Sequence, residues 1–175
     1  MKIRSISALF ILVVVGLVIS SCKKTISGPT EAQEIALLAK YIAKFHPTVT
    51  PKPYGLYVIE TKAAPVGSDS LKVGDVVNVF CTANLIQEDA SGNVSDGIQF
   101  YTTGDVTPIT FTVGAGSVIP GWEEGLTFVT NGSEAKFIIP SWLAYYNVGY
   151  GGIPAYSTLI YYVKVSKVVA ISIAK

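Results

Sequence analysis

The stretch Val118-Ile119-Pro120-Gly121-Trp122-Glu123-Glu124-Gly125-Leu126 decides the fold of this chain. Two apolar residues lead into a Pro-Gly turn, and Trp122 then opens a short helix that we predict over residues 120–128. A tryptophan at the mouth of such a turn can form the floor of a pocket, with its N–H paired beneath the ring. Glu123 and Glu124 suggest paired carboxylates for acid–base chemistry, but adjacent helix positions point about 100° apart. We therefore assign the two acids to the electrostatics of the helix start.

Short segments rich in β-branched and aromatic residues lie on both sides of this helix. We predict strands at residues 56–60, 76–86, 99–102, 109–113, 135–139 and 159–169. A polar loop is predicted at residues 87–98, and a second loop, with aromatic residues and glycines, at 140–158. Several antiparallel strands with one short helix between them indicate an α+β domain in which the sheet wraps the helix.

A further helix is predicted ahead of this domain, from Glu31 to Phe45. Thr30 and Gln33 have the spacing of a capping box, and apolar residues follow at helical intervals. The dipeptide His46-Pro47 ends the helix, and residues 48–53 form a proline-spaced linker. We expect His46, the only histidine, to lie in solvent at the helix end.

The N-terminus has the pattern of a targeting segment. Lys2 and Arg4 precede an apolar run from Ala8 to Ile19, which is short for a membrane span but typical of a signal-peptide core. Ile19-Ser20-Ser21-Cys22 looks like a bacterial lipobox, so we expect residues 1–21 to be a signal peptide and Cys22 to be lipidated. An ordinary signal peptide, or a buried helix with an incidental cysteine, is the alternative. The lipobox predicts a lipoprotein of the bacterial cell envelope that faces the periplasm.

Composition excludes several classes of function. Removing residues 1–21 would leave 11 basic and 12 acidic residues without a basic run, so we expect no nucleic-acid partner. Cys81 is the only other cysteine, so no intramolecular disulfide can form once Cys22 is lipidated. The fold must rest on its apolar core, and we expect a monomer.

Three motifs in order resemble the FKBP-type peptidyl-prolyl isomerases. They are Val118–Leu126, the segment Ile139-Pro140-Ser141-Trp142-Leu143-Ala144-Tyr145, and Ile153-Pro154 followed by Thr158-Leu159-Ile160-Tyr161. The resemblance covers roughly residues 54–170, and the preceding helix and linker resemble the extension of bacterial lipoprotein members. Together with the N-terminal targeting pattern, it predicts three parts. Residues 1–21 are a signal peptide, residues 22–53 a tether, helix and linker, and residues 54–175 an FKBP-like domain in which a sheet wraps a short helix.

The resemblance also implies a site. Trp122 would form the pocket floor, the backbone N–H of Ile119 would hold one substrate carbonyl, and the Tyr145 hydroxyl would donate to another. The walls would come from six further residues, Phe100, Tyr101, Ile109, Val118, Ile153 and Tyr161. For Phe100 alone, an ordinary place in the core is an equal alternative. No cofactor or metal is implied, because twisting an Xaa-Pro amide requires neither nucleophile nor metal.

The sequence departs from the family pattern in ways that bear on activity. Tyr101 stands where the family usually has an acid, and Cys81 stands where it has a wall tyrosine. Ile109 replaces a common aromatic, Tyr161 a phenylalanine and Tyr146 a glycine. The leading prediction is a prolyl isomerase that assists the folding of exported, proline-containing polypeptides. A non-catalytic module that grips proline segments or unfolded chains is the alternative, and a structural envelope protein is a third.

Overall fold

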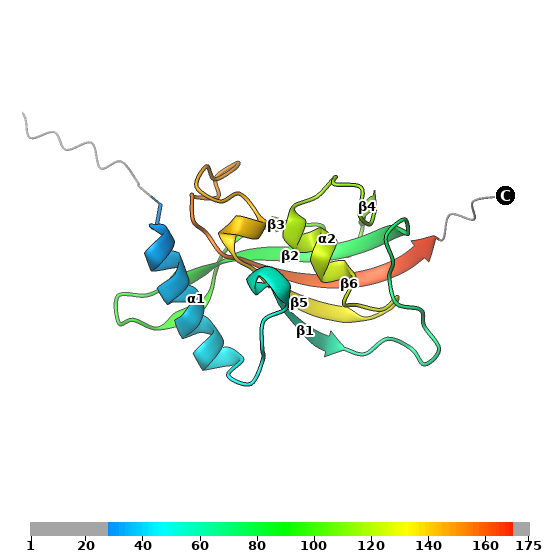
Figure 1. Ribbon diagram of the computed structural model, residues 1–175, viewed down its shortest axis with the longest axis horizontal. Coiled ribbons are helices and arrows are strands. Elements are labelled where there is room, and N and C mark those ends of the chain that lie inside the picture. The colour runs from blue at the N-terminus through cyan, green and yellow to red at the C-terminus, as the bar shows by residue number, and fades with distance from the viewer. Residues whose placement is uncertain (1–27, 170–175) are drawn as a thin grey trace, which may run out of the picture.

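The computed structural model describes residues 28–169, so the predicted signal peptide and Cys22 lie outside the described part. The elements are α1 (Glu31–Phe45), η1 (Pro53–Gly55), β1 (Tyr57–Lys62), β2 (Val76–Glu88), β3 (Val94–Thr102), β4 (Ile109–Thr112), α2 (Pro120–Leu126), β5 (Glu134–Ile139), η2 (Ser141–Leu143) and β6 (Leu159–Val169) (Figure 1). We call residues 140–158, which join β5 to β6, the pocket loop. No helix within residues 28–169 has the length and apolar composition needed to cross a bilayer.

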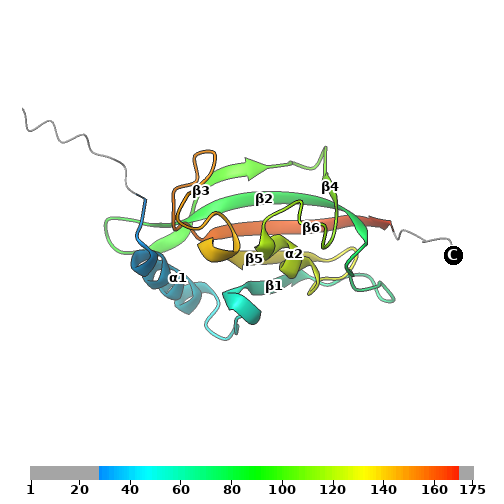
Figure 2. The same ribbon diagram turned by 45° about the horizontal axis from the view of Figure 1, so that its top comes forward.

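The strands form one antiparallel sheet in the order β1-β5-β6-β2-β3. One edge of β2 is shared, because β4 pairs with its first residues, 76–79, and β3 pairs with residues 82–88. The sheet curves around α2, as the tilted view shows (Figure 2). This arrangement confirms the predicted α+β fold with a sheet wrapped around a short helix.

Two glycines let α2 lie against β5. A Cβ atom on Gly121 would come 2.3 Å from Cγ2 of Ile139, and one on Gly125 would come 2.8 Å from the ring of Phe137. Both distances are closer than real side chains pack, so these positions have room only for hydrogen. The spacing of Gly121 and Gly125 thus sets how deeply Trp122, between them, sits in the core.

The sheet has an apolar cluster on each face. Phe137, Leu159 and Tyr161 belong to the cluster around Trp122, whereas Ile138 and Ile160 belong to the cluster around α1. Successive strand residues point to opposite faces, so α2 and the buried side chains of α1 lie on opposite sides of the sheet.

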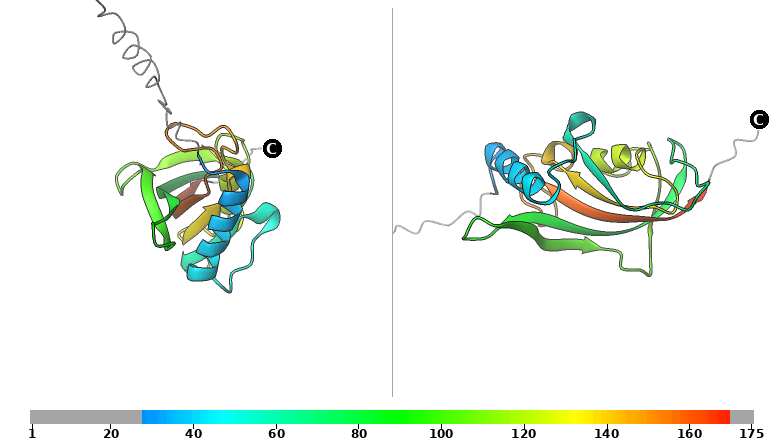
Figure 3. Two further views of the ribbon diagram at one scale, coloured as in Figure 1. Left: turned by 90° about the vertical axis from the view of Figure 1, so that its left-hand side faces the viewer. Right: turned by 90° about the horizontal axis from the view of Figure 1, so that it is seen from below.

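The N-terminal helix is part of this packed body. The capping box of Thr30 and Gln33 is present, and α1 has the predicted bounds. Leu38 and Tyr41 are buried against the sheet. End-on, α1 crosses one end of the sheet obliquely (Figure 3).

Two local predictions are wrong. The predicted loop at residues 87–98 is too long, because β2 continues to Glu88 and β3 begins at Val94, which leaves only residues 89–93 as a loop. Val94 is buried against α1, an arrangement that a polar local sequence does not reveal.

His46 is half-buried rather than solvated, with its ring centroid 6.2 Å from that of Tyr41. Burial together with the Lys136 charge lowers its pKa.

Candidate functional site

A pocket of about 370 Å³ lies over α2, within the size range of small-ligand sites. All nine of the predicted pocket residues line it: Phe100, Tyr101, Ile109, Val118, Ile119, Trp122, Tyr145, Ile153 and Tyr161. Ser117, Tyr150 and Gly151 also line it and were not predicted. The structure therefore brings together side chains from β3, β4, α2, β6 and the pocket loop.

The indole of Trp122 forms the base of this pocket. Its side chain is almost fully buried and packs against Phe111, with the ring centroids 5.7 Å apart. Tyr161 meets it edge-on at 5.1 Å. The expected partner for the indole N–H is absent, since Trp122 Nε1 is buried without a hydrogen-bond acceptor among the described residues. The side chains packed around the indole are mostly apolar.

Ile119 presents a backbone donor at the pocket wall. It is the N-cap of α2, and its carbonyl accepts hydrogen bonds from the N–H groups of Trp122 at 2.9 Å and Glu123 at 3.3 Å. Its own N–H has no acceptor within residues 28–169. That N–H is therefore available to a bound carbonyl.

Glu123 has a role that the helix-start explanation missed. Its carboxylate accepts hydrogen bonds from the backbone N–H groups of Gly114 and Gly116, the latter at 2.8 Å. These bonds fix the turn that delivers Val118 and Ile119 to the pocket. Glu124 lies outside the first turn of α2, and burial raises the pKa of its carboxyl group. The two acids thus have separate environments and do not form a catalytic pair.

The pocket loop supplies a stacked pair of tyrosines. The rings of Tyr145 and Tyr150 lie 5.0 Å apart with an angle of 14° between their planes. Gly151 and Gly152 have φ values of 52° and 93°, which allow a tight turn that brings Ile153 back opposite Tyr150. Burial, followed by the neighbouring Tyr150, raises the pKa of Tyr145, so its hydroxyl remains a donor at neutral pH. The Gly-Gly pair was the sequence signal that could have identified Tyr150.

The pocket is suited to binding rather than to acid–base or nucleophilic chemistry. None of its lining side chains is charged at neutral pH. Four tyrosines line it, Tyr101, Tyr145, Tyr150 and Tyr161, and none of their hydroxyls has a hydrogen-bond partner within residues 28–169. Such a surface can bury an apolar ring and donate hydrogen bonds to carbonyl oxygens.

The family model described as FKBP-type peptidyl-prolyl cis-trans isomerase matches residues 67–166, more than half of the chain. The chain belongs to the FKBP-type peptidyl-prolyl cis-trans isomerase family. The match ends shortly after Tyr161 and therefore covers the whole pocket.

Individual relatives agree with this assignment. FK506-binding protein 2 of Debaryomyces hansenii is 43% identical over 81 residues, which are 45% of this chain and 58% of that protein. The FK506-binding protein of Neisseria meningitidis serogroup C is 35% identical over 116 residues, 65% of this chain and 97% of that protein. The crystal structure of FkpA from Escherichia coli superposes with a TM-score of 0.65 at 29% identity, covering 80% of this chain and 59% of that one. This chain thus matches less than two thirds of the length of the Debaryomyces and Escherichia coli proteins.

The departures from the FKBP pattern can now be placed. Tyr101 is 44% exposed and lies on the pocket lining without filling the pocket. Cys81 is buried in the core behind the pocket, and burial raises its pKa to about 12, so the thiol stays protonated. Ile109 is half-buried and keeps an apolar wall where an aromatic is common. The pocket therefore lacks the family's acid but keeps Trp122 at its base, and Ile119 and Tyr145 still line it.

Proposed function

We propose that this FKBP-family chain is a peptidyl-prolyl cis-trans isomerase acting on proline-containing segments of exported polypeptides. One observation carries the proposal. An uncharged aromatic pocket with Trp122 at its base presents two unpaired donors, the Ile119 N–H and the Tyr145 hydroxyl.

The chemistry follows from the amide bond. An Xaa-Pro bond isomerises over tens to hundreds of seconds, because twisting it destroys the resonance between nitrogen and carbonyl. The twisted carbonyl is less amide-like and needs less hydration than the planar one. A pocket that buries the proline ring and excludes water therefore binds the twisted form better than the planar form.

Each residue has a distinct part in this proposal. Trp122 supports the proline ring from below, and Val118, Phe100, Ile153 and Tyr161 enclose it. The Ile119 N–H and the Tyr145 hydroxyl hold the carbonyls on either side of the ring, which fixes the flanking chain while the amide turns. Tyr101 and Ile109 shape the rim, where residues next to the proline would lie.

The test is exchange NMR on a short Xaa-Pro peptide with the full chain solubilised in a mild detergent. Wild type should speed cis/trans interconversion above buffer. Tyr145→Phe should lower kcat/KM by about tenfold, in keeping with the loss of one hydrogen bond to the transition state. Trp122→Ala should abolish the rate. Circular dichroism must first show that Trp122→Ala is folded, because its indole is also core. A wild-type rate equal to buffer would overturn the proposal.

A second candidate rests on the replacements at Tyr101 and Cys81. A pocket without its usual acid and wall tyrosine can bind proline segments without speeding their rotation. This non-catalytic module predicts peptide binding and suppression of client aggregation with no rate enhancement. A protein that neither binds an Xaa-Pro peptide nor delays aggregation of an unfolded client would exclude it.

The location is proposed from the sequence alone. The lipobox at Ile19–Cys22 supports a lipid anchor on Cys22, which would tether the domain to a membrane of the cell envelope. Mass spectrometry of the protein from the membrane fraction should show an acylated N-terminal Cys22. Cys22→Ala should prevent both the modification and the membrane association.

A further inference from the structure

We propose that Glu34, in the N-terminal helix, is a positioning residue that holds both ends of the pocket loop and thereby places Tyr145. The catalytic consequence rests on the proposed isomerase function, but the structural consequence does not. Glu34 lies far from the pocket motifs in sequence, and its hydrogen-bond partners Ser141 and Thr158 do not line the pocket.

Glu34 is a buried carboxylate with three donors around it. Glu34 is only 1% exposed to solvent. Oε1 accepts hydrogen bonds from the backbone N–H of Ser141 at 2.7 Å and from the hydroxyl of Thr158 at 2.8 Å, and Oε2 accepts one from the Ser141 hydroxyl at 2.5 Å. A buried carboxylate is costly unless such bonds satisfy it. Its presence here is explained by what it joins.

The two partners stand at the two ends of the pocket loop. Ser141 begins η2, directly after β5 and Pro140, and Thr158 immediately precedes β6. Both are buried. A single carboxylate of α1 therefore clamps the start and the end of a loop whose interior carries Tyr145, Tyr150 and Ile153.

Ser141 passes this constraint directly to Tyr145. The Ser141 carbonyl accepts hydrogen bonds from the N–H groups of Ala144 and Tyr146, each at 2.8 Å. These two residues flank Tyr145. Ser141 thus has its N–H and hydroxyl bound to Glu34 and its carbonyl bound on both sides of the pocket tyrosine, so a shift of Ser141 would move the backbone that carries that ring.

The segment leading into α1 also lies against the pocket loop, at Pro154 and Ala155. A Cβ atom on Gly28 would come 2.9 Å from the Ala155 carbonyl oxygen and 3.0 Å from Cβ of Pro154. Figure 2 shows the pocket loop, in orange, beside the N-terminal end of α1. The segment before α1 therefore contacts the loop shortly before its C-terminal end, in addition to the bonds that Glu34 makes at the two ends.

The central experiment compares Glu34→Ala with Glu34→Gln in the full chain in detergent. Glutamine can keep its carbonyl oxygen at the Oε1 position, where it still accepts from Ser141 and Thr158, whereas alanine leaves those donors unpaired in the interior. We expect Glu34→Ala to speed amide hydrogen exchange at Ala144 and Tyr146 by at least about tenfold and to lower kcat/KM about tenfold, mainly through KM. Glu34→Gln should stay within about twofold of wild type in both measurements.

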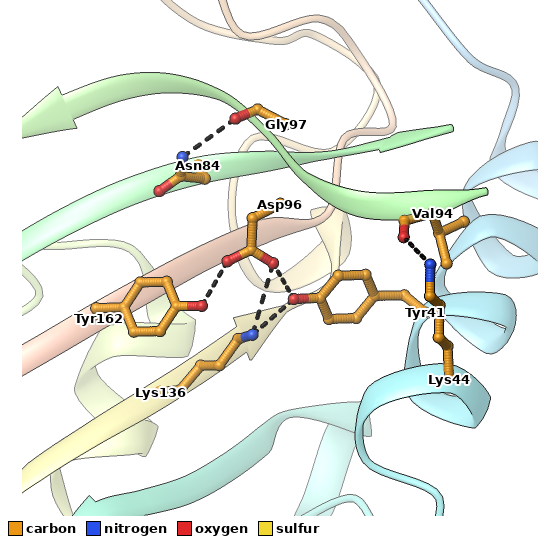
Figure 4. Close-up of polar contacts among 8 residues, drawn as sticks. All are labelled: Tyr41, Lys44, Asn84, Val94, Asp96, Gly97, Lys136 and Tyr162. Carbon is orange, nitrogen blue, oxygen red and sulfur yellow. Dashed lines mark hydrogen bonds and ion pairs between the residues drawn. The ribbon is translucent and has the colours of Figure 1, made fainter. Parts of the chain in front are cut away.

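Tyr41→Phe is the matched control on the same helix. The Tyr41 hydroxyl donates to Asp96 and accepts a hydrogen bond from Lys136 at 2.6 Å, on the other face of the sheet (Figure 4). Its loss weakens the docking of α1 without removing a bond to the pocket loop, so it should destabilise the chain without changing exchange at Ala144 and Tyr146. If Tyr41→Phe alters loop exchange and KM as much as Glu34→Ala does, Glu34 acts only through global stability, and the proposal is wrong.

Thr158→Val provides a second route if Glu34→Ala does not fold. It removes only the bond at the far end of the loop and should produce a smaller change in exchange and KM of the same kind. Unchanged exchange at Ala144 and Tyr146 in both Glu34→Ala and Thr158→Val would overturn the proposal. If wild type itself shows no isomerisation, the proposed function fails, while the exchange rates still decide the role of Glu34.

Discussion

The ring of Tyr161 meets the indole of Trp122 edge-on, with the ring centroids 5.1 Å apart and the planes at 85°. Phe100 in turn stands edge-on to Tyr161 at 6.0 Å. This arrangement places the Tyr161 hydroxyl, where the family usually has a phenylalanine, among the groups that line the pocket. Burial raises the pKa of Tyr161, with smaller contributions from Tyr145, Cys81 and Tyr101. The hydroxyl is therefore a neutral donor inside an apolar wall.

Tyr161→Phe should separate the binding and structural roles of that hydroxyl. Because it has no acceptor within residues 28–169, its removal should leave the free energy of unfolding unchanged or slightly higher. If the hydroxyl donates to bound peptide, affinity should fall about three- to tenfold, the worth of one neutral hydrogen bond. Urea unfolding and peptide titration measure the two effects.

Tyr162→Phe is the adjacent control on the opposite face of the sheet. The Tyr162 hydroxyl donates to Asp96, so its loss should lower stability and leave peptide affinity unchanged. Equal affinities for wild type and Tyr161→Phe would show that the extra hydroxyl does not contact the substrate.

The stacking of Tyr150 on Tyr145 predicts a binding effect without a stability effect. Tyr150 is 67% exposed, so Tyr150→Ala removes little buried surface. It does free the Tyr145 ring from its stacking partner, and we expect KM to rise several-fold with kcat nearly constant, as for loss of a preorganised contact. Exchange NMR at several peptide concentrations gives both constants. A fall in kcat with unchanged KM would instead indicate that Tyr150 acts only in the transition state.

The sequence predicted α1 and the pocket motifs well because their signals are local. The capping box at Thr30 and the His46-Pro47 stop define α1 without reference to the rest of the chain. In Val118–Leu126, the turn, the close-packing glycines and Trp122 all lie within nine residues. Each of these features depends only on residues that are close together in the chain, so the sequence alone predicts it.

The errors have long-range causes. Residues 94–98 contain polar residues typical of a loop, yet Val94 is buried under α1 and Asp96 binds Tyr41, Tyr162 and Lys136 (Figure 4). Those partners are far away in the chain, so the local sequence gave no sign of a strand. Glu34 was missed for the same reason, since in the sequence it is one of two acids in a first helical turn.

The cluster around Asp96 predicts a pH dependence of stability. Burial is the largest single effect and disfavours ionisation, but hydrogen bonds from Tyr162 and Tyr41 and the charge of Lys136 together outweigh it, so the pKa of Asp96 lies below its ordinary value. A lowered carboxyl pKa stabilises the fold above the unfolded pKa of about 3.9, and that contribution is lost as pH falls through the folded pKa. The free energy of unfolding should therefore drop as pH is lowered below about 4.

Asp96→Asn tests this contribution. The variant should be less stable than wild type at neutral pH, because the buried Lys136 loses its charged partner, and its stability should fall less steeply below about pH 4. Urea unfolding at a series of pH values gives the two slopes. Asp69→Asn, at an exposed position, should leave the wild-type slope intact. Parallel curves for wild type and Asp96→Asn would contradict the assignment.

Tyr146 occupies a backbone conformation that favours glycine, which explains why the family usually has glycine there. Its φ is 44°, and a side chain in the left-handed region costs about 1 kcal/mol. Tyr146→Gly and Tyr146→Ala both lose the edge-on contact with the Tyr156 ring at 5.5 Å, so the difference between them isolates the backbone. Glycine should be the more stable by about 1 kcal/mol in urea unfolding. At Asn147, which lacks a positive φ, the same pair should show alanine equal or better. Equal stabilities of the two variants at position 146 would mean that the loop relaxes out of the left-handed region. The hydrogen bonds of Glu34 at the two ends of the loop would then not fix the backbone of the residue after Tyr145.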